Sequence, residues 1–386
     1  MPGRAVAFRA RGRVSRTYLD WNATAPIRPE ARDAMVGAMD LVGNPSSVHA
    51  EGRGAKALLE RCRTEILEAA GAQGYDLIFT SGATEAAATA LSGGWSRIIA
   101  SEVEHDCIAA HAPLMAERWQ AAGVGRDGIV PPSGVLARDP GRGDLVAVQL
   151  ANSETGVRQD VPGMLSELRH GGAAMLADAV QSFGKLPFAA SWQPPAIYML
   201  SAHKIGGPKG IGALLVPQGT DLAPLIVGGG QEMSRRAGTE NLAGIAGFAA
   251  AAGAAQRDLE RGEWDRVAEL RKILESLLEA GDHPTISVGK DAPRLPNTLC
   301  FIAPGWKGET QVMRMDLEGF AISAGSACSS GKVRSSRVLR AMGYGDGEAD
   351  CAVRISLGPA TTKVEVRAFA DAWRKARDKA ARRRAA

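Results

Sequence analysis

One lysine of this chain stands between two apolar segments, where lysine is seldom found. Lys204 follows the apolar residues 196–200 and precedes a glycine-rich turn and a second apolar segment at 211–216. Each segment has the length and composition of a buried strand, and lysine is rarely buried without a partner. We therefore expect Lys204 at the end of a strand, where the sheet opens towards a cleft.

A second group of residues has the composition of a phosphate site. Residues 81–84, with the sequence Ser-Gly-Ala-Thr, follow the strand-like residues 76–80 and open a helix. The start of a helix offers free backbone N–H groups and a positive dipole end, and this one also carries a hydroxyl group. The alternative is an ordinary helix cap with Glu85 in the first turn.

Two more strand-like segments end in side chains with acid–base or hydrogen-bonding groups. His105 follows residues 97–104, and Asp178 lies at the end of residues 173–179, with Gln181 just after it. The histidine ring is either structural or stacked on a planar ligand. The carboxylate either caps a helix or holds a proton on a heteroaromatic nitrogen, which would stabilise a cationic ring.

These groups are expected at one edge of a sheet, because ligands of α/β sheets bind beyond the carboxyl ends of the strands. A phosphate cup, a stacking ring, a carboxylate for a ring nitrogen and a lysine together match the needs of pyridoxal 5′-phosphate. The lysine forms a Schiff base with its aldehyde, and the carboxylate keeps the pyridine ring protonated, so that the ring withdraws electrons. The combination predicts a pyridoxal-phosphate site.

The cysteines show neither disulfide nor zinc spacing. Their number is odd and no pair has the spacing C-x-x-C, which favours a reducing, cytoplasmic setting over a disulfide framework or a zinc cluster. The five are Cys62, Cys107, Cys300, Cys328 and Cys351. Cys328 differs because glycine, serine and alanine flank it, as in an exposed loop. Its thiol is either a nucleophile or incidental.

A buried arginine is expected near the C-terminus of the chain. Arg354 lies within the apolar, strand-like residues 351–358. A buried guanidinium group needs a carboxylate partner, which either the protein or a substrate supplies.

The elements that position these residues alternate between strand-like and helical segments. This alternation indicates an α/β fold with a mostly parallel sheet covered on both faces, and the mixture of strands and helices from about residue 287 indicates a smaller α+β domain. We expect residues 1–16 to be disordered or an extension. Residues 17–255 would form the large cofactor-binding domain, with an N-terminal segment reaching the small domain. Residues 256–386 would form the small C-terminal domain with the Cys328 loop.

Composition argues against some classes of function. A net charge of +4 without a dominant basic patch does not call for a nucleic-acid partner. No apolar run approaches the roughly 18–20 residues of a membrane span. The first 16 residues contain five arginines and no acidic residue, but they lack the apolar region of a secretory signal. We interpret them as an extension, with a transit-like segment as the alternative.

Ordered motifs along nearly the whole chain resemble one enzyme family. The chain is similar to cysteine desulfurases of the NifS/IscS kind, in the class V aminotransferase group of fold type I pyridoxal-phosphate enzymes. The similarity runs from residues 18–26 (YLDWNATAP) to residues 353–358 (VRISLG). The motifs between them are GNPSSVHAEGR, TSGATE, EVEHD, ADAVQS, SAHKIGGPKGIG, GGGQEMSRRAGTEN, SAGSACSSG and VLRAMG. The resemblance implies a large domain with a mostly parallel mixed sheet and a smaller C-terminal domain.

The resemblance also implies how each matching residue serves the cofactor. Lys204 would form the Schiff base and later move the proton at the substrate Cα. Asp178 would pair with the pyridine nitrogen, Gln181 would hydrogen-bond the phenolic oxygen, and His105 would stack on the ring and assist proton transfer. Thr239 would reach the phosphate of the neighbouring subunit, which implies a homodimer. The phosphate of the same subunit would be bound by Ala83, Thr84, Ser201 and His203.

The reaction implied is the removal of sulfur from L-cysteine. Asn22 and Arg354 would hold this substrate, Arg354 through the substrate carboxylate. Cys328 would attack the sulfur, leaving L-alanine and an enzyme persulfide. The persulfide would pass to an acceptor, such as an iron–sulfur scaffold protein, for Fe–S cluster assembly or other sulfur transfer. No metal site is expected on the bare chain, although Cys328 would be able to ligate a transferred Fe–S cluster.

Two other functions stay open from the sequence. A selenocysteine lyase or another class V aminotransferase would share the cofactor residues, with Cys328 incidental. A sulfur-carrier scaffold would use the Cys328 loop and the basic C-terminal tail but would have no need of Lys204.

Besides the mild change to SACSS at residues 326–330, where Ser-Ala-Cys-Thr-Ser is common, the chain departs from the family pattern at two places. Residues 152–154 read Asn-Ser-Glu, where the family has Asn-Asn-Glu. The second asparagine normally helps to fix the ring, so this contact is either lost or taken over by Ser153. Residues 357–360 read LGPA, where family members often have Leu-Gly-Arg-Phe.

Overall fold

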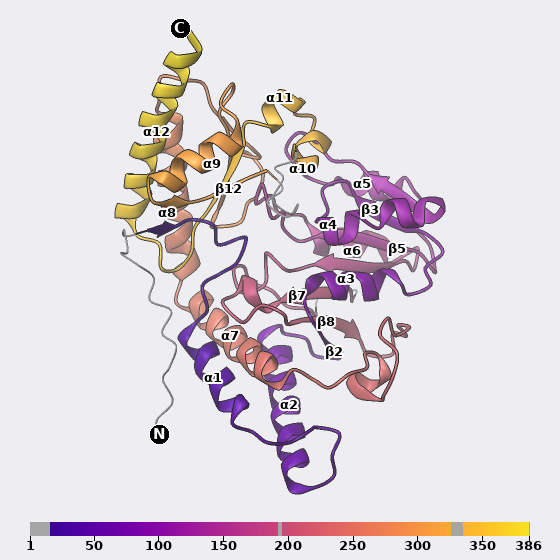
Figure 1. Ribbon diagram of the computed structural model, residues 1–386. Helices are drawn as coiled ribbons and strands as arrows, with labels where there is room; N and C mark the ends of the chain where they lie inside the picture. Colours follow the sequence, from indigo (N-terminus) through magenta and orange to yellow (C-terminus); the bar gives the residue numbers. More distant parts are fainter. Residues whose placement is uncertain (1–15, 192–194, 326–334, 386) are drawn as a thin grey trace, which may run out of the picture.

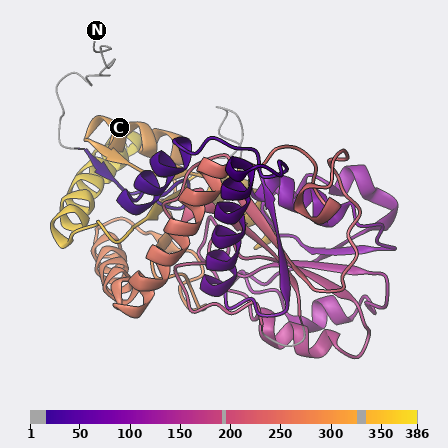
Figure 2. The ribbon, with the colours of Figure 1, turned by 90° about the horizontal axis from the view of Figure 1, so that it is seen from below.

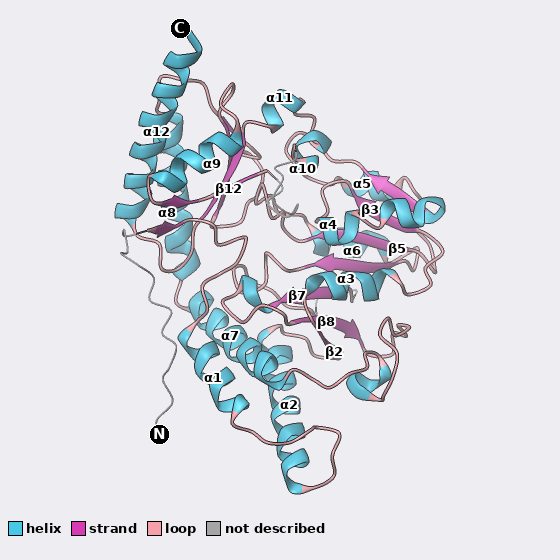
Figure 3. Ribbon diagram, in the orientation of Figure 1, coloured by secondary structure: helices cyan, strands magenta, loops and turns pink. Residues whose placement is uncertain are grey.

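The computed structural model describes residues 16–191, 195–325 and 335–385 of the chain. Figure 1 shows a large sheet with helices on both faces and, beside it, a smaller group of strands and helices that includes α8, α9 and α12. In Figure 3 the strands of the large sheet lie between layers of helix, as an α/β fold requires.

A seven-stranded sheet with the order β2-β8-β7-β6-β5-β3-β4 forms the centre of the larger part. All neighbours from β7 to β4 are parallel, whereas β8 is antiparallel to both β2 and β7. The predicted mostly parallel mixed sheet is therefore confirmed. The bounds are β2 Tyr75–Thr80, β3 Ile98–Ser101, β4 Trp119–Ala122, β5 Leu145–Gln149, β6 Ala174–Asp178, β7 Ile197–Ser201 and β8 Gly212–Pro217.

Alternate side chains of these strands enter two hydrophobic cores on opposite faces of the sheet. In β5, Val146 and Val148 belong to one core, and Leu145 and Ala147 belong to the other. Every residue of β5 and of β7 is buried. Strands covered on both faces have mostly apolar sequences, and this pattern allowed them to be predicted from the sequence.

Helices cover both faces of the sheet and supply the other side of each core. Helices α3 (Ala83–Leu91) and α4 (Asp106–Ala109) lie on one face. The opposite core contains residues of α2 (Ala50–Ala69), α5 (Pro132–Leu136), α6 (Val161–Leu168) and α7 (Leu242–Glu260). Helix α7 also packs against α1 (Pro29–Met39), and Figure 2 shows the indigo helices of the N-terminal part beside the salmon-coloured α7. Three short 3-10 helices are Ala112–Arg118, Ala202–Lys204 and Gln231–Ser234.

The smaller part has its own antiparallel sheet, with the order β12-β13-β10-β9. A separate core, which contains Trp264, Phe301, Phe369 and Trp373, joins this sheet to its helices. The strands are β9 Ile286–Ser287, β10 Thr298–Ile302, β12 Ser323–Ala324 and β13 Ala352–Ser356. Its helices are α8 Glu263–Glu279, α9 Gly308–Leu317 and α12 Lys363–Ala385. Helices α10 (Arg337–Ala341) and α11 (Asp346–Ala349) instead place Val338, Leu339 and Ala349 in the core of the larger part.

The N-terminal segment crosses from this smaller part to the larger one. Strand β1 (Thr17–Tyr18) pairs in parallel with β11 (Phe320–Ala321), and Leu19 is buried in the core of the smaller part. The residue limits of the two domains stay a prediction. Of the helices in the described part of the chain, none is both long and apolar enough to cross a membrane.

Candidate active site

A cavity of about 820 Å³ lies at the carboxyl edge of the central sheet. Its walls come from the segments that follow β2, β3, β5, β6 and β7, which run in the same direction and end at the same edge. The structure thereby brings together most of the predicted cofactor residues. Those that line the cavity are Ala83, Thr84, His105, Asp178, Gln181, Ser201, His203 and Lys204.

Lys204 follows β7 directly, at the end of a short 3-10 turn. Its Nζ donates hydrogen bonds to the backbone oxygen of Asn22 at 2.7 Å and to that of the next residue at 3.0 Å. The turn after Lys204 requires glycine at position 206. Gly206 has a φ of +87°, and a Cβ there would lie 2.6 Å from Cγ of Arg28. The lysine therefore lies at a strand end beside the cavity, as expected.

Helix α3 begins at the cavity. Its N-cap residue, Gly82, makes no side-chain capping bond, and a Cβ there would meet no atom within 4 Å, so the backbone faces open space. Glu85 accepts a hydrogen bond from the backbone N–H of Ser81 at 2.8 Å, so a side-chain cap is also present. Thr84 and Ser201 line the same cavity. The helix terminus and these two residues fit a phosphate group.

Asp178 places a buried carboxylate at the end of β6. Its Oδ1 accepts a hydrogen bond from the backbone N–H of Val180 at 2.8 Å. Burial raises the pKa of Asp178 to about 6, although this hydrogen bond and the charge of Lys204 act in the opposite direction. A cation beside the carboxylate would offset the cost of burial. A protonated pyridine nitrogen is such a cation, so this wall of the cavity also fits pyridoxal 5′-phosphate.

Both histidines of the cavity are held in the neutral form. Burial lowers the pKa of His203 to about 4, and Lys204 acts in the same direction. Burial and Lys204 also lower the pKa of His105. The Nδ1 atom of His105 accepts a hydrogen bond from the backbone N–H of Cys107 at 3.1 Å and so caps α4. The neutral ring of His105 therefore carries its proton on Nε2.

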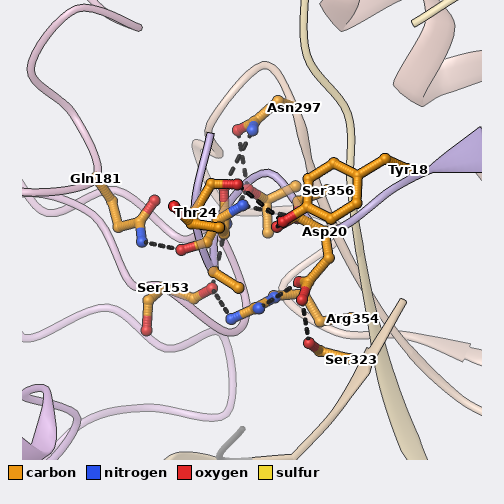
Figure 4. A network of polar contacts seen from close by, with 12 residues as sticks. Tyr18, Asp20, Thr24, Ser153, Gln181, Asn297, Ser323, Arg354 and Ser356 are labelled. Carbon is orange, nitrogen blue, oxygen red and sulfur yellow. Dashed lines mark hydrogen bonds and ion pairs between the residues drawn. The ribbon is translucent and has the colours of Figure 1, made fainter. Parts of the chain in front are cut away.

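Asn22 and Gln181 belong to a buried polar network beside the cavity (Figure 4). Nε2 of Gln181 donates to the backbone oxygen of Asn22 at 3.0 Å. The side chain of Asn22 donates to Oγ1 of Thr298 at 2.8 Å and accepts from Nδ2 of Asn297 at 3.0 Å. Asn22 is 1% exposed, and it is not among the residues that line the cavity. Its contact with the substrate stays a prediction.

Arg354 of β13 is buried against a carboxylate from the other end of the chain. Its Nη2 lies 2.6 Å from Oδ1 of Asp20, and its Nη1 donates to the backbone oxygen of Ser153 at 3.1 Å (Figure 4). Ser323 donates to Oδ2 of the same aspartate at 2.7 Å. The protein thus supplies one carboxylate partner. The Nε of Arg354 is buried and has no hydrogen-bond partner among the described residues, and Arg354 is not among the residues that line the cavity. Its contact with a substrate carboxylate stays a prediction.

The four cysteines that the structure describes are all buried: Cys62, Cys107, Cys300 and Cys351. Burial raises the pKa of Cys62 to about 11 and that of Cys300 to about 12, so both thiols are poor nucleophiles near neutral pH. Cys328 lies outside the described residues. Cys107 lines the cavity, so the choice of Cys328 as the reactive thiol stays a prediction.

Thr239 does not line the cavity of its own chain. It is exposed in the segment between β8 and α7. The same segment is tied to the start of α3, because Nε of Arg236 lies 2.9 Å from Oε1 of Glu85. Its role towards a neighbouring subunit stays a prediction.

Several residues of the site were not predicted from the sequence. Lys209 and Gln149 line the cavity, and Lys185 is buried against Gln181 and Asn22. Lys209 was within reach of sequence reasoning, since it is a second cation in the motif that contains Lys204. Lys185 had no such signal, because its burial arises only from the tertiary structure.

The two departures from the family pattern both lie at cavities. Ser153 lines the main cavity, so the chain places a hydroxyl group where the family has an amide. Pro359 and Ala360 line a second cavity of about 220 Å³, which Lys185 and Lys204 also line.

Comparison with known proteins gives the family. Residues 17–369 match the family Aminotransferase class-V. The chain belongs to this family. The class V enzyme is 38% identical over 367 residues to a cysteine desulfurase of Cereibacter sphaeroides, covering 92% of this chain and 93% of that protein. It is 35% identical over 363 residues to the cysteine desulfurase IscS of Dictyoglomus turgidum, covering 90% and 91%.

A solved structure of a NifS-like protein from Rickettsia africae has the same fold as the class V enzyme. The two chains superpose with a TM-score of 0.87 at 32% identity, over 94% of this chain and 99% of that chain. The family depends on pyridoxal 5′-phosphate. The comparisons confirm the predicted family, fold class and cofactor, and they confirm the prediction of an enzyme of the cysteine desulfurase type. The roles of individual residues are not tested by them.

Proposed function

We propose that this class V enzyme converts L-cysteine to L-alanine and leaves the sulfur atom as a persulfide on Cys328. The observation that carries the proposal is the meeting of Lys204, Asp178 and the start of α3 in one cavity. These groups serve a bound pyridoxal phosphate, and a mere sulfur carrier would not need them. Relatives named cysteine desulfurase match over 90% and 92% of the chain.

The cavity would hold the cofactor at three points. The N–H groups of α3, with Thr84, Ser201 and His203, would bind the phosphate, and Asp178 would pair with the protonated ring nitrogen. Nε2 of Gln181 would donate a hydrogen bond to the phenolic oxygen. When bound, the cofactor supplies a ring that withdraws electrons from the substrate Cα.

The remaining steps belong to side chains of this protein. Lys204 would hold and move the proton at the substrate Cα, and the neutral His105 would stack on the ring and assist this transfer. Arg354 would orient the substrate by binding its carboxylate. The sulfur of L-cysteine would bond to Sγ of Cys328 as its bond to Cβ breaks, so cysteine and an enzyme thiol become alanine and an enzyme persulfide.

The described residues on both sides of the Cys328 segment contact the site, which supports this role for Cys328. On one side, Ser323 donates to Asp20, the partner of Arg354. On the other side, Ser336 donates to Oε2 of Glu154 at 2.6 Å, and the guanidinium group of Arg337 donates to the backbone oxygen of Glu104, next to His105.

The proposal extends to the sulfur acceptor, the oligomeric state and the cellular setting of the enzyme. The persulfide sulfur would pass to an acceptor protein, such as an Fe–S scaffold. The enzyme would act as a homodimer in which Thr239 reaches the neighbouring phosphate. Apolar side chains exposed in the same segment support a subunit contact there; they are Leu225, Ile226, Val227 and Met233. A cytoplasmic setting is supported by Cys62, Cys300 and Cys351, which are buried thiols outside any disulfide among the described residues.

The purified protein tests the proposal directly. Loaded with pyridoxal 5′-phosphate, it is expected to show a visible absorbance band that shifts when L-cysteine is added. Under a thiol reductant, alanine and sulfide are expected in equal amounts. A protein that binds the cofactor but forms neither product would contradict the desulfurase function.

Asp178→Asn is expected to lower turnover by roughly 10²-fold or more, because the variant lacks the carboxylate that stabilises a cationic ring nitrogen. The pKa of about 6 adds a pH dependence. Below this pH the carboxyl group is protonated in the wild type, so cofactor affinity falls as the pH drops through 6. The phosphate group of the cofactor also titrates near pH 6, but it does so in the wild type and in Asp178→Asn alike.

The difference between wild type and Asp178→Asn therefore isolates the carboxyl group. Cofactor dissociation constants measured from pH 5 to pH 8 are expected to converge at low pH and to diverge above about 6. If the dissociation constants of the two proteins differ by the same factor from pH 5 to pH 8, Asp178 does not contact the ring nitrogen.

A further inference from the structure

Lys185 is a buried lysine to which the proposed reaction gives no role. It follows β6 in the same segment as Asp178, and 2% of its surface is exposed. Its Nζ donates hydrogen bonds to Oε1 of Gln181 at 2.7 Å and to Oδ1 of Asn22 at 3.1 Å. Both acceptors are neutral amide oxygens on residues of the candidate active site.

The turn before Lys185 determines where this side chain enters the site. Gly184 has a φ of +71°, and a Cβ there would lie 2.8 Å from Cβ of Ala255 in α7 and 3.0 Å from Cγ2 of Ile205. A residue other than glycine would not fit. Because Ile205 directly follows Lys204, the turn that carries Lys185 packs against the turn that carries the reactive lysine.

The contacts of Lys185 determine which way the Gln181 amide faces. The Nζ of Lys185 donates to Oε1 of Gln181, which is the acceptor atom of that amide. The NH₂ group of Gln181 then faces away from Lys185 and donates to the backbone oxygen of Asn22. This same oxygen accepts a hydrogen bond from Nζ of Lys204. Two lysines are thus connected through one glutamine and one asparagine.

The surroundings of Lys185 disfavour the charged form of its amine. Burial lowers its pKa well below the usual value, and the charged groups that act on it, Lys204 and Arg354, are both cations. A neutral amine has two N–H groups, and two amide oxygens are in place to accept them. The amine then satisfies both acceptors without a buried charge.

We propose that Lys185 is a positioning residue that keeps the NH₂ group of Gln181 directed at the phenolic oxygen of the bound cofactor and keeps Asn22 beside Lys204. The inference rests on the function proposed above and adds a residue to it. A hydrogen-bond donor at the phenolic oxygen stabilises negative charge there. It thereby favours loss of the proton from the nitrogen through which Lys204 holds the cofactor.

Lys185→Met tests the proposal, because methionine has a similar length and no donor. The variant is expected to bind the cofactor covalently, since Lys204, Asp178 and the start of α3 are unchanged. The pH midpoint of the cofactor absorbance change is expected to rise by about one unit, as loss of one hydrogen bond to a charged group implies. Turnover is expected to fall about 10-fold, with KM for L-cysteine changed less than about two-fold.

A merely structural role would lower the thermal stability and leave the pH midpoint unchanged, and that result would overturn the proposal. The double variant with Gln181→Ala locates the effect. If Lys185 acts through Gln181, Lys185→Met adds little further shift in the Gln181→Ala protein. Full additivity of the two shifts would overturn the assignment to Gln181.

Lys185→Arg keeps donors at this position, and the cavity of about 220 Å³ beside Lys185 leaves room for the longer side chain. This variant is expected to restore the midpoint, and failure to do so in a folded protein would count against the proposal.

Lys272→Met, at an exposed lysine of α8, is the matched control. If Lys185→Met does not fold, Lys185→Leu, which also lacks a donor, is expected to shift the midpoint upwards, and an unchanged midpoint overturns the inference. A wild-type protein without the absorbance band would instead contradict the proposed function.

Discussion

Replacing Lys204 with alanine is expected to reduce alanine formation from L-cysteine by roughly 10³-fold or more. The variant lacks the amine that bonds the cofactor and moves the proton at the substrate Cα. In the wild type this amine is held beside the cavity by the backbone oxygens of Asn22 and Ala23. Borohydride reduction followed by peptide mass analysis should find the cofactor on the peptide with Lys204 and should find none on the variant.

Other lysine amines lie in or near the site, so an experiment can contradict the assignment of Lys204 as the lysine that bonds the cofactor. Lys209 lines the cavity, and Lys185 lies close to it. Attachment of the cofactor to either of these in the wild type would contradict the assignment of Lys204. Lys272→Ala serves as the control, because Lys272 is an exposed residue of α8 that pairs with Glu269, and full activity is expected.

Replacing Cys328 with serine is expected to reduce sulfide and alanine formation by roughly 10³-fold while leaving cofactor binding intact. A serine hydroxyl does not form a persulfide. Cys62 and Cys300 offer no substitute, because burial raises the pKa of Cys62 to about 11 and that of Cys300 to about 12. The measurement is a single turnover with L-cysteine, in which the absorbance change is expected but alanine is not.

Cys62→Ala is the matched control for Cys328→Ser. Cys62 lies on α2, outside the residues that line the main cavity, and normal turnover is expected. Full alanine formation by Cys328→Ser would end the persulfide mechanism. Alanine formed by that variant from L-selenocysteine, but not from L-cysteine, would instead favour a selenocysteine lyase.

The strands that carry the site could be predicted because they are buried on both faces. Residues 145–148 and 197–200 are continuously apolar, and the side chains at the ends of such strands have recognisable chemistry. Asp178 ends β6 and Lys204 follows β7, so the sheet itself brings them together. In these places local sequence and tertiary structure give the same answer.

Other parts of the site depend on contacts between distant segments, which no local pattern reveals. Asp20 pairs with Arg354 across 334 positions of sequence, and Lys185 meets Asn22 across 163. The sequence of residues 320–324, FAISA, has the pattern of one strand, but the structure has two short strands, β11 and β12, in different sheets. The pairing with β1 at one end and β13 at the other divides this segment. Strand β4 was not predicted, since its sequence, WQAA, is short and lies at a sheet edge.

The most direct test of the account is to locate the sulfur after one turnover. The loaded enzyme is mixed with L-cysteine without reductant, treated with a thiol-blocking reagent, digested and analysed by mass spectrometry. The account predicts one added sulfur atom on the peptide with Cys328 and an equal amount of alanine. Alanine formed without sulfur on Cys328, or with the sulfur on Cys107, which lines the cavity, would contradict it.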